Sequence, residues 1–325
     1  MPSRSEKVRK WVLRTGYPLE LEVVDALRAH DWNVMASVNY FDEDETKWRE
    51  LDGKAYKHKH FGKVACAPSS PYQLTFTLIL QCKKSEKFTW IFFPTREGKE
   101  LGIEYIDFLK VARVQSLASR DPISIRQHRI LGISRDILLE PPLFDPDIAR
   151  EIKWLSELAP LKLADFRSFA DIKIALTGIT APLSGSGKSP NQLFEAAATA
   201  TKALVYEREI TSNVYHASLS LFKFSKLDSV DVKPYFGINV ILPVIVFDGS
   251  IYLWKGRNSD LKEIDHVVYS FDYRSPWYFG RYAINVIKKD LLDTFLEELD
   301  KDLMNLGLRL QEIKNELNRQ VEMLR

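Results

Sequence analysis

An acid, an amide and a lysine occupy positions from which they could act together on a phosphate ester. Gln81 and Lys83 follow the apolar run LTFTLIL, and Asp52 precedes that run in the segment RELDGKAY. Side chains of a strand alternate between its two faces, so Gln81 and Lys83 should project together while Cys82 points away. This pattern predicts metal-assisted hydrolysis of a phosphodiester at the end of a buried strand.

The oxygen-bearing groups of this cluster suit Mg²⁺ or Mn²⁺. Magnesium takes ligands from one or two carboxylates, from water and from substrate, and it activates water and neutralises charge on a scissile phosphate. Asp52 is the predicted principal ligand, with the Gln81 amide oxygen and the Cys82 backbone carbonyl as further ligands. Lys83 would contact the attacking water or the phosphate, and Glu20, on an upstream helix, would close the site.

Each of these residues also has a purely structural interpretation. Asp52 could bend or end a strand, and Lys83 with Lys84 could form a solvated strand end. Glu20 lies where a first-turn acid stabilises a helix dipole without any chemistry. Glu50 shares the strand face of Asp52 and is either a reserve ligand or a solvent-facing acid. A carboxylate inside a strand needs a partner, which favours a site at Asp52.

The elements that position these residues follow an α/β pattern. Apolar residues recur at helical spacing in LELEVVDALRAH, directly after Gly16-Tyr17-Pro18, and predict a helix. The continuous apolarity of the run at 74–80 predicts a strand that is covered on both faces. Strand patterns are found at residues 32–42, 48–57, 74–83 and 87–94.

A basic segment lies between the second and third of these strands. Residues 58–72 contain two prolines and adjacent serines, and we expect a connecting loop or a lid there. Lysines interleave with Tyr56 and Phe61, which predicts a surface that contacts nucleic-acid phosphates. The lysines assigned to that surface are Lys54, Lys57, Lys59, Lys63 and Lys84.

These motifs resemble the PD-(D/E)xK nuclease superfamily, which has a restriction-endonuclease-like core. The resemblance covers roughly the first 100 residues, through the segments GYPLE (Gly16 to Glu20), RELD (Arg49 to Asp52) and LILQCKKS (Leu78 to Ser85). It implies a mixed sheet flanked by helices and a magnesium- or manganese-dependent endonuclease acting on DNA, with RNA as a second substrate class. Defence against foreign DNA, or repair, is the role that the resemblance implies.

The chain departs from that family at Gln81, where the common residue is Glu or Asp. Mrr-like restriction enzymes use Gln-x-Lys, so the departure points toward that branch or toward lost activity. The exchange removes one negative charge from the expected metal site. The alternative function is therefore a catalytically inactive nuclease-like module that binds nucleic acid or assembles complexes.

The remainder of the chain predicts three further segments after a nuclease-like domain at 1–115. Residues 116–190 should be a linker and packing extension, and residues 191–287 a second α/β domain. Residues 288–325 form an amphipathic helix in which leucines recur every three or four positions. This stripe either packs on the protein itself or forms a coiled coil in a homodimer.

The composition is that of an ordinary globular protein. The 325 residues are 45% hydrophobic and 28% charged, and a net charge of +2 does not by itself identify a nucleic-acid partner. Two cysteines are too few for a disulfide framework or a four-thiolate zinc site. The sequence shows neither a secretory signal nor a run of apolar residues long enough for a membrane helix. We therefore expect a cytoplasmic protein with no membrane partner.

Overall fold

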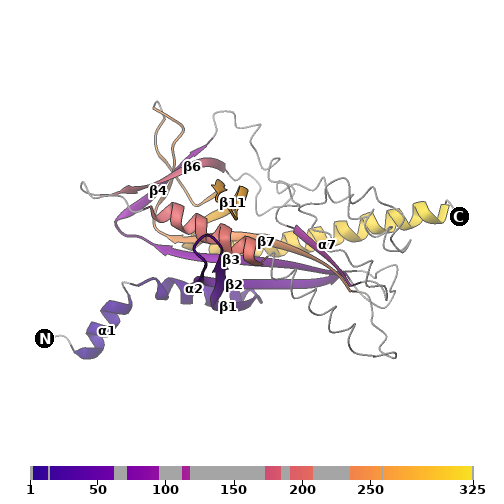
Figure 1. Cartoon of the computed structure of the whole chain (residues 1–325), viewed down its shortest axis with the longest axis horizontal. Coiled ribbons are helices and arrows are strands. Elements are labelled where there is room, and N and C mark those ends of the chain that lie inside the picture. The colour runs from indigo at the N-terminus through magenta and orange to yellow at the C-terminus, as the bar shows by residue number, and fades with distance from the viewer. Residues whose placement is uncertain are drawn as a thin grey trace.

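One large mixed sheet flanked by helices organises the protein (Figure 1). The structure is a computed structural model. It describes residues 3–13, 15–61, 72–94, 112–117, 173–183, 191–207, 235–257 and 259–323.

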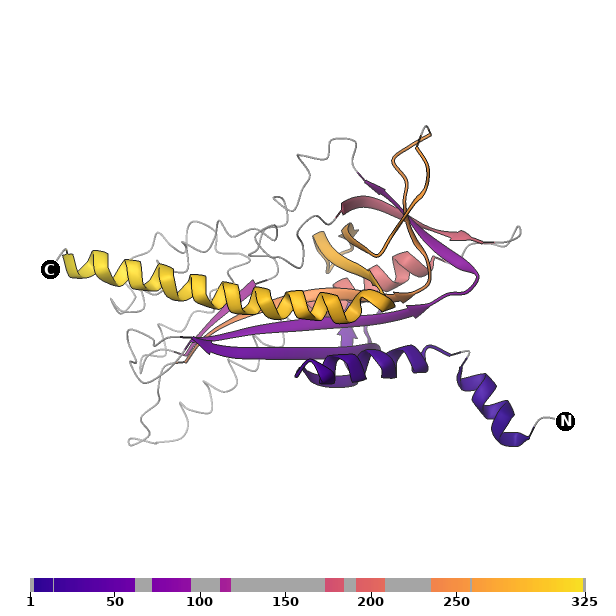
Figure 2. The same cartoon turned by 180° about the vertical axis from the view of Figure 1, so that it is seen from behind.

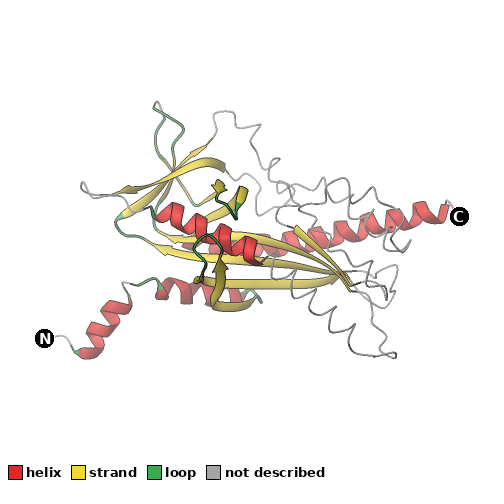
Figure 3. Cartoon of the chain, in the orientation of Figure 1, coloured by secondary structure: helices red, strands yellow, loops and turns green. Residues whose placement is uncertain are grey.

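Two helices open the described chain, runs of strands follow on either side of a single helix, and a long helix ends it (Figure 3). The helices are α1 (Arg4–Val12), α2 (Tyr17–Ala29), an unlabelled helix over residues 192–207, the short 3₁₀ helix η6 (Lys289–Leu291) and α7 (Leu292–Met323). The strands are β1 (Asn33–Asp42), β2 (Lys47–Phe61), β3 (Tyr72–Lys84), β4 (Phe88–Pro94), β5 (Ala112–Leu117), β6 (Lys173–Pro182), β7 (Tyr235–Asp248), β8 (Ile251–Leu253), β9 (Lys262–Ile264), β10 (His266–Arg274) and β11 (Phe279–Lys288).

The strands form a single eleven-stranded sheet in the order β1-β2-β3-β7-β11-β10-β6-β4-β8-β9, with β5 also paired to β7. At its centre β3 and β7 run parallel from Tyr72↔Phe236 to Lys84↔Asp248. Both strands are continuously apolar, and such strands are stable where both faces of the sheet are covered. The predicted burial of β3 is confirmed, since residues such as Phe76 and Leu78 are almost fully buried.

The central pairing joins parts of the chain that the sequence patterns had divided. Strands β7, β10 and β11 come from the predicted second domain at 191–287, yet β7 pairs along the whole length of β3. Strand β6, from the predicted linker, pairs with β4 and β10. An apolar strand such as β3 needs a partner strand on each edge. Strand β2 pairs with one edge of β3, and β7 pairs with the other. The structure therefore has one sheet where two separate units were expected.

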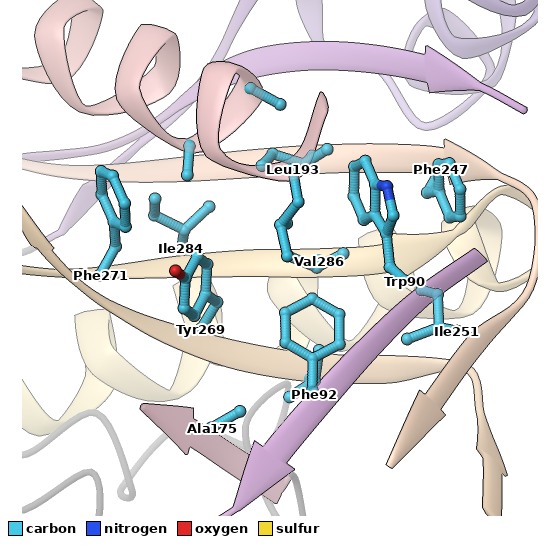
Figure 4. Close-up of a cluster of buried hydrophobic side chains, with 14 of the residues drawn as sticks. Trp90, Phe92, Ala175, Leu193, Phe247, Ile251, Tyr269, Phe271, Ile284 and Val286 are labelled. Atoms are coloured by element: carbon cyan, nitrogen blue, oxygen red, sulfur yellow. The ribbon is translucent and has the colours of Figure 1, made fainter. Parts of the chain in front are cut away.

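Helices cover both faces of this sheet. The helix at 192–207 lies on one face, and α2 and α7 lie on the opposite face (Figures 1 and 2). Between the sheet and the helix at 192–207 is a core in which Trp90 stacks on Phe247 with ring centroids 3.9 Å apart. Leu193 and the inward side chains of β10 and β11 complete it (Figure 4).

The two predicted amphipathic helices bury the faces that their spacing indicated. In α2 the buried residues are Leu19, Val23, Val24 and Leu27. In the first half of α7 the stripe residues Leu292, Leu299, Leu303 and Leu306 are buried. This part of the stripe therefore packs on the protein itself. The side chains of the stripe beyond residue 308 lie outside the described set, and a homodimeric coiled coil there stays a prediction.

Two local differences from the sequence patterns concern the first half of the chain. Strand β2 continues through Phe61, which pairs with Tyr72, so residues 58–61 belong to the sheet and not to a loop. Alternating aromatic and long side chains suit a paired strand as well as a connection, which explains the difference. Residues 62–71 lie outside the described part of the chain. The basic leader, to which no element had been assigned, forms helix α1.

Candidate active site

The predicted site lies where β2 and β3 separate. The two strands pair from Phe61↔Tyr72 to Gly53↔Leu80. Beyond that point β2 continues only with β1, whereas β3 continues with β7. Asp52 is the first residue of β2 past the last pair, and its Oδ2 accepts the backbone N–H of Cys82 at 2.6 Å. The carboxylate thus satisfies a buried amide that the strand ladder no longer pairs.

Lys83 reaches the same carboxylate oxygen. Its Nζ lies 3.8 Å from Asp52 Oδ2, within ion-pair distance. The Lys83 side chain is 27% exposed and that of Asp52 is 19% exposed, so both groups are half-buried yet open to a ligand from solvent. The predicted pairing of an acid on β2 with a lysine on β3 is therefore present in the structure.

Glu20 belongs to the same electrostatic neighbourhood. It lies in the first turn of α2, and its Oε1 is 3.1 Å from the point at which a Cβ of Gly16 would stand. Glycine at this position therefore leaves room for the carboxylate. Burial raises the pKa of Glu20, the negative charges of Asp52 and Glu50 raise it further, and the Lys83 ammonium opposes them.

The pKa of Asp52 is also raised. Burial is the main cause, and the exposed carboxylate of Glu50 adds to it. The Lys83 charge and the hydrogen bond from the Cys82 amide act in the opposite direction. Neighbouring carboxylates repel one another when both are charged, and a bound cation would stabilise their charged forms. Groups with shifted pKa values of this kind are common in functional sites.

Gln81 is not brought together with these groups. It pairs with Ile245 of β7, whose side chain packs in the core beside the helix at 192–207. Only 2% of Gln81 is exposed, and its Nε2 donates a long hydrogen bond of 3.5 Å to the Leu80 carbonyl. Among the described interactions none joins its side chain to Asp52 or Lys83. Lys83 lies on the same face of β3 as Gln81, as the alternation of side chains predicted. Its side chain is longer than that of Gln81, and it reaches Asp52.

The carboxylates are the groups of this site that suit a hard divalent ion such as Mg²⁺. The described residues include no group of three or more His, Cys, Asp or Glu side chains placed to hold a metal ion. Asp52 and Glu20 nevertheless provide the one or two carboxylates that Mg²⁺ or Mn²⁺ combines with water and substrate oxygens. The Cys82 thiol is buried, and burial raises its pKa, so it stays protonated and is no thiolate ligand. Its backbone carbonyl stays a predicted ligand.

The lysines predicted to form one phosphate-binding surface are separated by the sheet. Lys54 pairs with Glu207 of the helix at 192–207, with 2.5 Å between Nζ and Oε1. Lys57 pairs with Asp300 of α7, at 2.7 Å, on the opposite face. These two lysines therefore neutralise internal acids and cannot contact one ligand together.

The other lysines of that predicted surface do not restore it. The Nζ of Lys59 lies 2.8 Å from the sulfur of Met304 in α7. Lys84 lies 3.9 Å from Glu86 and 3.8 Å from Asp248, at the end of the strand. Lys63 lies outside the described residues. Only Lys83 and Lys84 remain beside the candidate site.

The structure contains a buried ionic cluster that the sequence patterns did not identify. Lys202 donates to both carboxylate oxygens of Asp42, at 3.0 and 2.9 Å, and lies 3.1 Å from Asp44. Arg49 bonds the same carboxylate of Asp42, and the Tyr273 hydroxyl donates to Asp44 at 2.9 Å. One feature of the sequence could have indicated the cluster: Lys202 interrupts a run of buried alanines in the helix at 192–207. The cluster ties this helix to the turn after β1.

Comparisons with known proteins leave the family open. No protein-family model matches the chain, and neither the curated proteins nor the solved structures include a significant match. Within the described residues, no helix is both long and apolar enough to cross a membrane. The functional proposal therefore rests on the residues of the site.

Proposed function

We propose that the protein is a divalent-metal-dependent nuclease with a restriction-endonuclease-like core, and that it hydrolyses phosphodiester bonds of DNA. The observation that carries this proposal is the approach of Lys83 to Asp52 where β2 and β3 part. The order of α2 with Glu20, β2 with Asp52 and β3 with Lys83 supports it, because this is the order that the resemblance implies.

The residues of the site have separate roles in this proposal. Asp52 and Glu20 would hold Mg²⁺ or Mn²⁺, which when bound activates water and neutralises charge on the scissile phosphate. Lys83 contributes a fixed positive charge for the phosphate or orients the attacking water. The Cys82 amide holds the Asp52 carboxylate in place. Gln81 is left out of the ligand set because its side chain is buried on the core side of β3.

A second function is favoured by one specific observation: the site has Asp52 and Glu20 as its carboxylates, and the buried Gln81 adds no third one. A site with two carboxylates binds a divalent ion more weakly than a site with three. The second function is therefore that of a protein that has the nuclease-like fold but no catalytic activity. Such a module would bind nucleic acid or assemble complexes without cutting. Only the first function predicts cleavage, whereas a module that binds nucleic acid predicts binding without cleavage.

The test is incubation of plasmid, linear and single-stranded DNA, and RNA, with Mg²⁺ or Mn²⁺. We expect cleavage of at least one DNA form by the wild type and none by Glu20→Gln combined with Asp52→Asn. Lys87→Ala is the matched control, because Lys87 is an exposed lysine just beyond β3. Binding of DNA with no cleavage by the wild type under any of these conditions would favour the inactive module.

A further inference from the structure

Helix α1 stands apart from the body of the described chain. Figures 1 and 2 show it projecting next to the start of α2, and none of its residues is buried. A helix of this length is marginally stable alone in water. Its order depends on local contacts, of which the capping box formed by Ser3 and Glu6 is the clearest. The helix is thus held in shape by its own residues, and all of its residues are exposed.

The charge of α1 suits a polyanionic partner. The cations of the helix are Arg4, Lys7, Arg9 and Lys10, and its single acid is Glu6. Its net charge of +3 exceeds the net charge of +2 of the entire chain, so the rest of the chain is close to neutral. The net positive charge of the chain therefore corresponds to that of a helix none of whose residues is buried.

The spacing of these residues adds an aromatic group to the charge. Arg4, Lys7 and Trp11 follow one another at intervals of three and four residues, so they form one stripe along the helix. Trp11 is 64% exposed. An exposed indole next to cations is a combination that binds a nucleic-acid strand, because cations contact phosphates and an aromatic ring stacks on a base.

The position of α1 connects it to the candidate active site. The helix ends at Val12, and α2 begins at Tyr17, which is itself exposed. Glu20 lies in the first turn of α2, with its carboxylate against Gly16. A strand bound along α1 is therefore only a few residues of chain away from the acids of the site.

We propose that α1 is a DNA-binding arm, with Arg4 and Lys7 on backbone phosphates and Trp11 stacked on a base, that delivers the strand to the site at Asp52. This inference rests on the proposed function. It assigns the nucleic-acid contact to the N-terminal helix in place of the lysines on β2, which the structure uses in internal pairs.

The test measures DNA binding by the full chain without divalent ions. A short fluorescent DNA duplex, and the matching single strand, are titrated in chelator at several salt concentrations, with fluorescence anisotropy as the readout. The arm variant is Arg4→Ala/Lys7→Ala/Trp11→Ala. The matched control is Lys255→Ala/Lys262→Ala/Trp277→Ala, which removes two exposed lysines and an indole that is also 64% exposed.

We expect the arm variant to bind DNA at least about tenfold more weakly than the wild type, since it loses two phosphate contacts and one stacking contact. Its plot of log affinity against log salt should be shallower by about 2, one for each lost phosphate contact. The control should bind as the wild type does. Equal binding by the arm variant would overturn the inference, as would wild-type binding to anionic phospholipid vesicles but to neither DNA.

Cleavage with Mg²⁺ separates this inference from the proposed function. At saturating DNA the arm variant should cut at the wild-type rate, with a raised KM and an unchanged kcat, because α1 holds no ligand of the site. Arm-dependent binding without any cleavage would support the arm and count against the nuclease. Cleavage with the same KM in both proteins would support the nuclease and count against the arm.

Discussion

The Asp52 carboxylate accepts the Cys82 amide across the point at which β2 and β3 part, with 2.6 Å between oxygen and nitrogen. This bond fixes an acid of one strand against the backbone of the other. Lys83 is the next residue of β3, and its ammonium group lies 3.8 Å from the same carboxylate oxygen. This part-buried hydrogen bond thereby fixes the acid of the candidate catalytic pair.

Lys83→Ala should reduce cleavage by about 10²-fold or more, because a fixed positive charge beside the phosphate is lost. Cleavage is measured as the rate of plasmid nicking at saturating Mn²⁺. Lys87→Ala, which removes an exposed lysine of the following turn, should leave the rate unchanged. If both variants cut as the wild type does, Lys83 has no role in the reaction.

Gln81→Glu should destabilise the protein by about 2 kcal/mol without increasing cleavage, because a charge would be placed among apolar neighbours that do not pair it. Gln81 is 2% exposed, and it pairs in the sheet with Ile245 of the core. The free energy of unfolding is measured in urea, and cleavage is measured alongside. A variant that cuts faster than the wild type would place residue 81 among the metal ligands.

The sequence predicted those elements whose patterns are local. The apolar stripe of α2 and the continuous apolarity of β3 depend only on neighbouring residues, and both are confirmed. Alternation along β3 also predicted correctly that Gln81 and Lys83 share a face. It could not predict that only Lys83 reaches Asp52, because this depends on where β2 leaves β3.

The single sheet could not be predicted for a related reason. Pairing of β3 with β7 joins strands that are far apart in the chain, and no local pattern specifies which apolar strand pairs with which. The ionic cluster at Asp42 and Lys202 has the same origin, since these two residues come from the end of β1 and from a distant helix. Both the single sheet and the ionic cluster thus depend on contacts between residues that are far apart in the chain.

Lys202→Met should lower the free energy of unfolding by about 3 kcal/mol, because the buried Asp42 carboxylate loses the cation that bonds both of its oxygens. Asp42 is only 1% exposed, and Arg49 would be its remaining cation. The measurement is urea denaturation monitored by circular dichroism. Asp42→Asn added to Lys202→Met should recover most of the loss, since the buried charge is then gone. A single variant as stable as the wild type would show that the cluster contributes nothing.

Acid should weaken the protein through His266. Burial lowers the pKa of His266 to about 4, although a hydrogen bond with Asn285 opposes this. The unfolded chain takes up the proton near pH 6.5 and the folded chain only near pH 4, so stability that is present above pH 6.5 is lost as the pH falls toward 4.

The size of this loss is measurable in a variant. The residue as a whole is half-buried, and we expect about 2 kcal/mol of pH-dependent stability from it. His266→Gln removes the titrating group, so the difference in unfolding free energy between variant and wild type should change between pH 7 and pH 4. A constant difference across that range would rule out His266 as the source.

The most direct test of the proposed function is the rate of DNA cleavage by Asp52→Asn. The substitution keeps an oxygen that can accept the Cys82 amide but removes the charge that would hold a metal ion. Because burial raises the pKa of Asp52, the neutral side chain should leave the protein at least as stable as the wild type at pH 7. We predict a folded variant that cuts DNA at least about 10²-fold more slowly than the wild type in Mg²⁺ or Mn²⁺. A folded variant that cuts at the wild-type rate would contradict the assignment of the active site to Asp52.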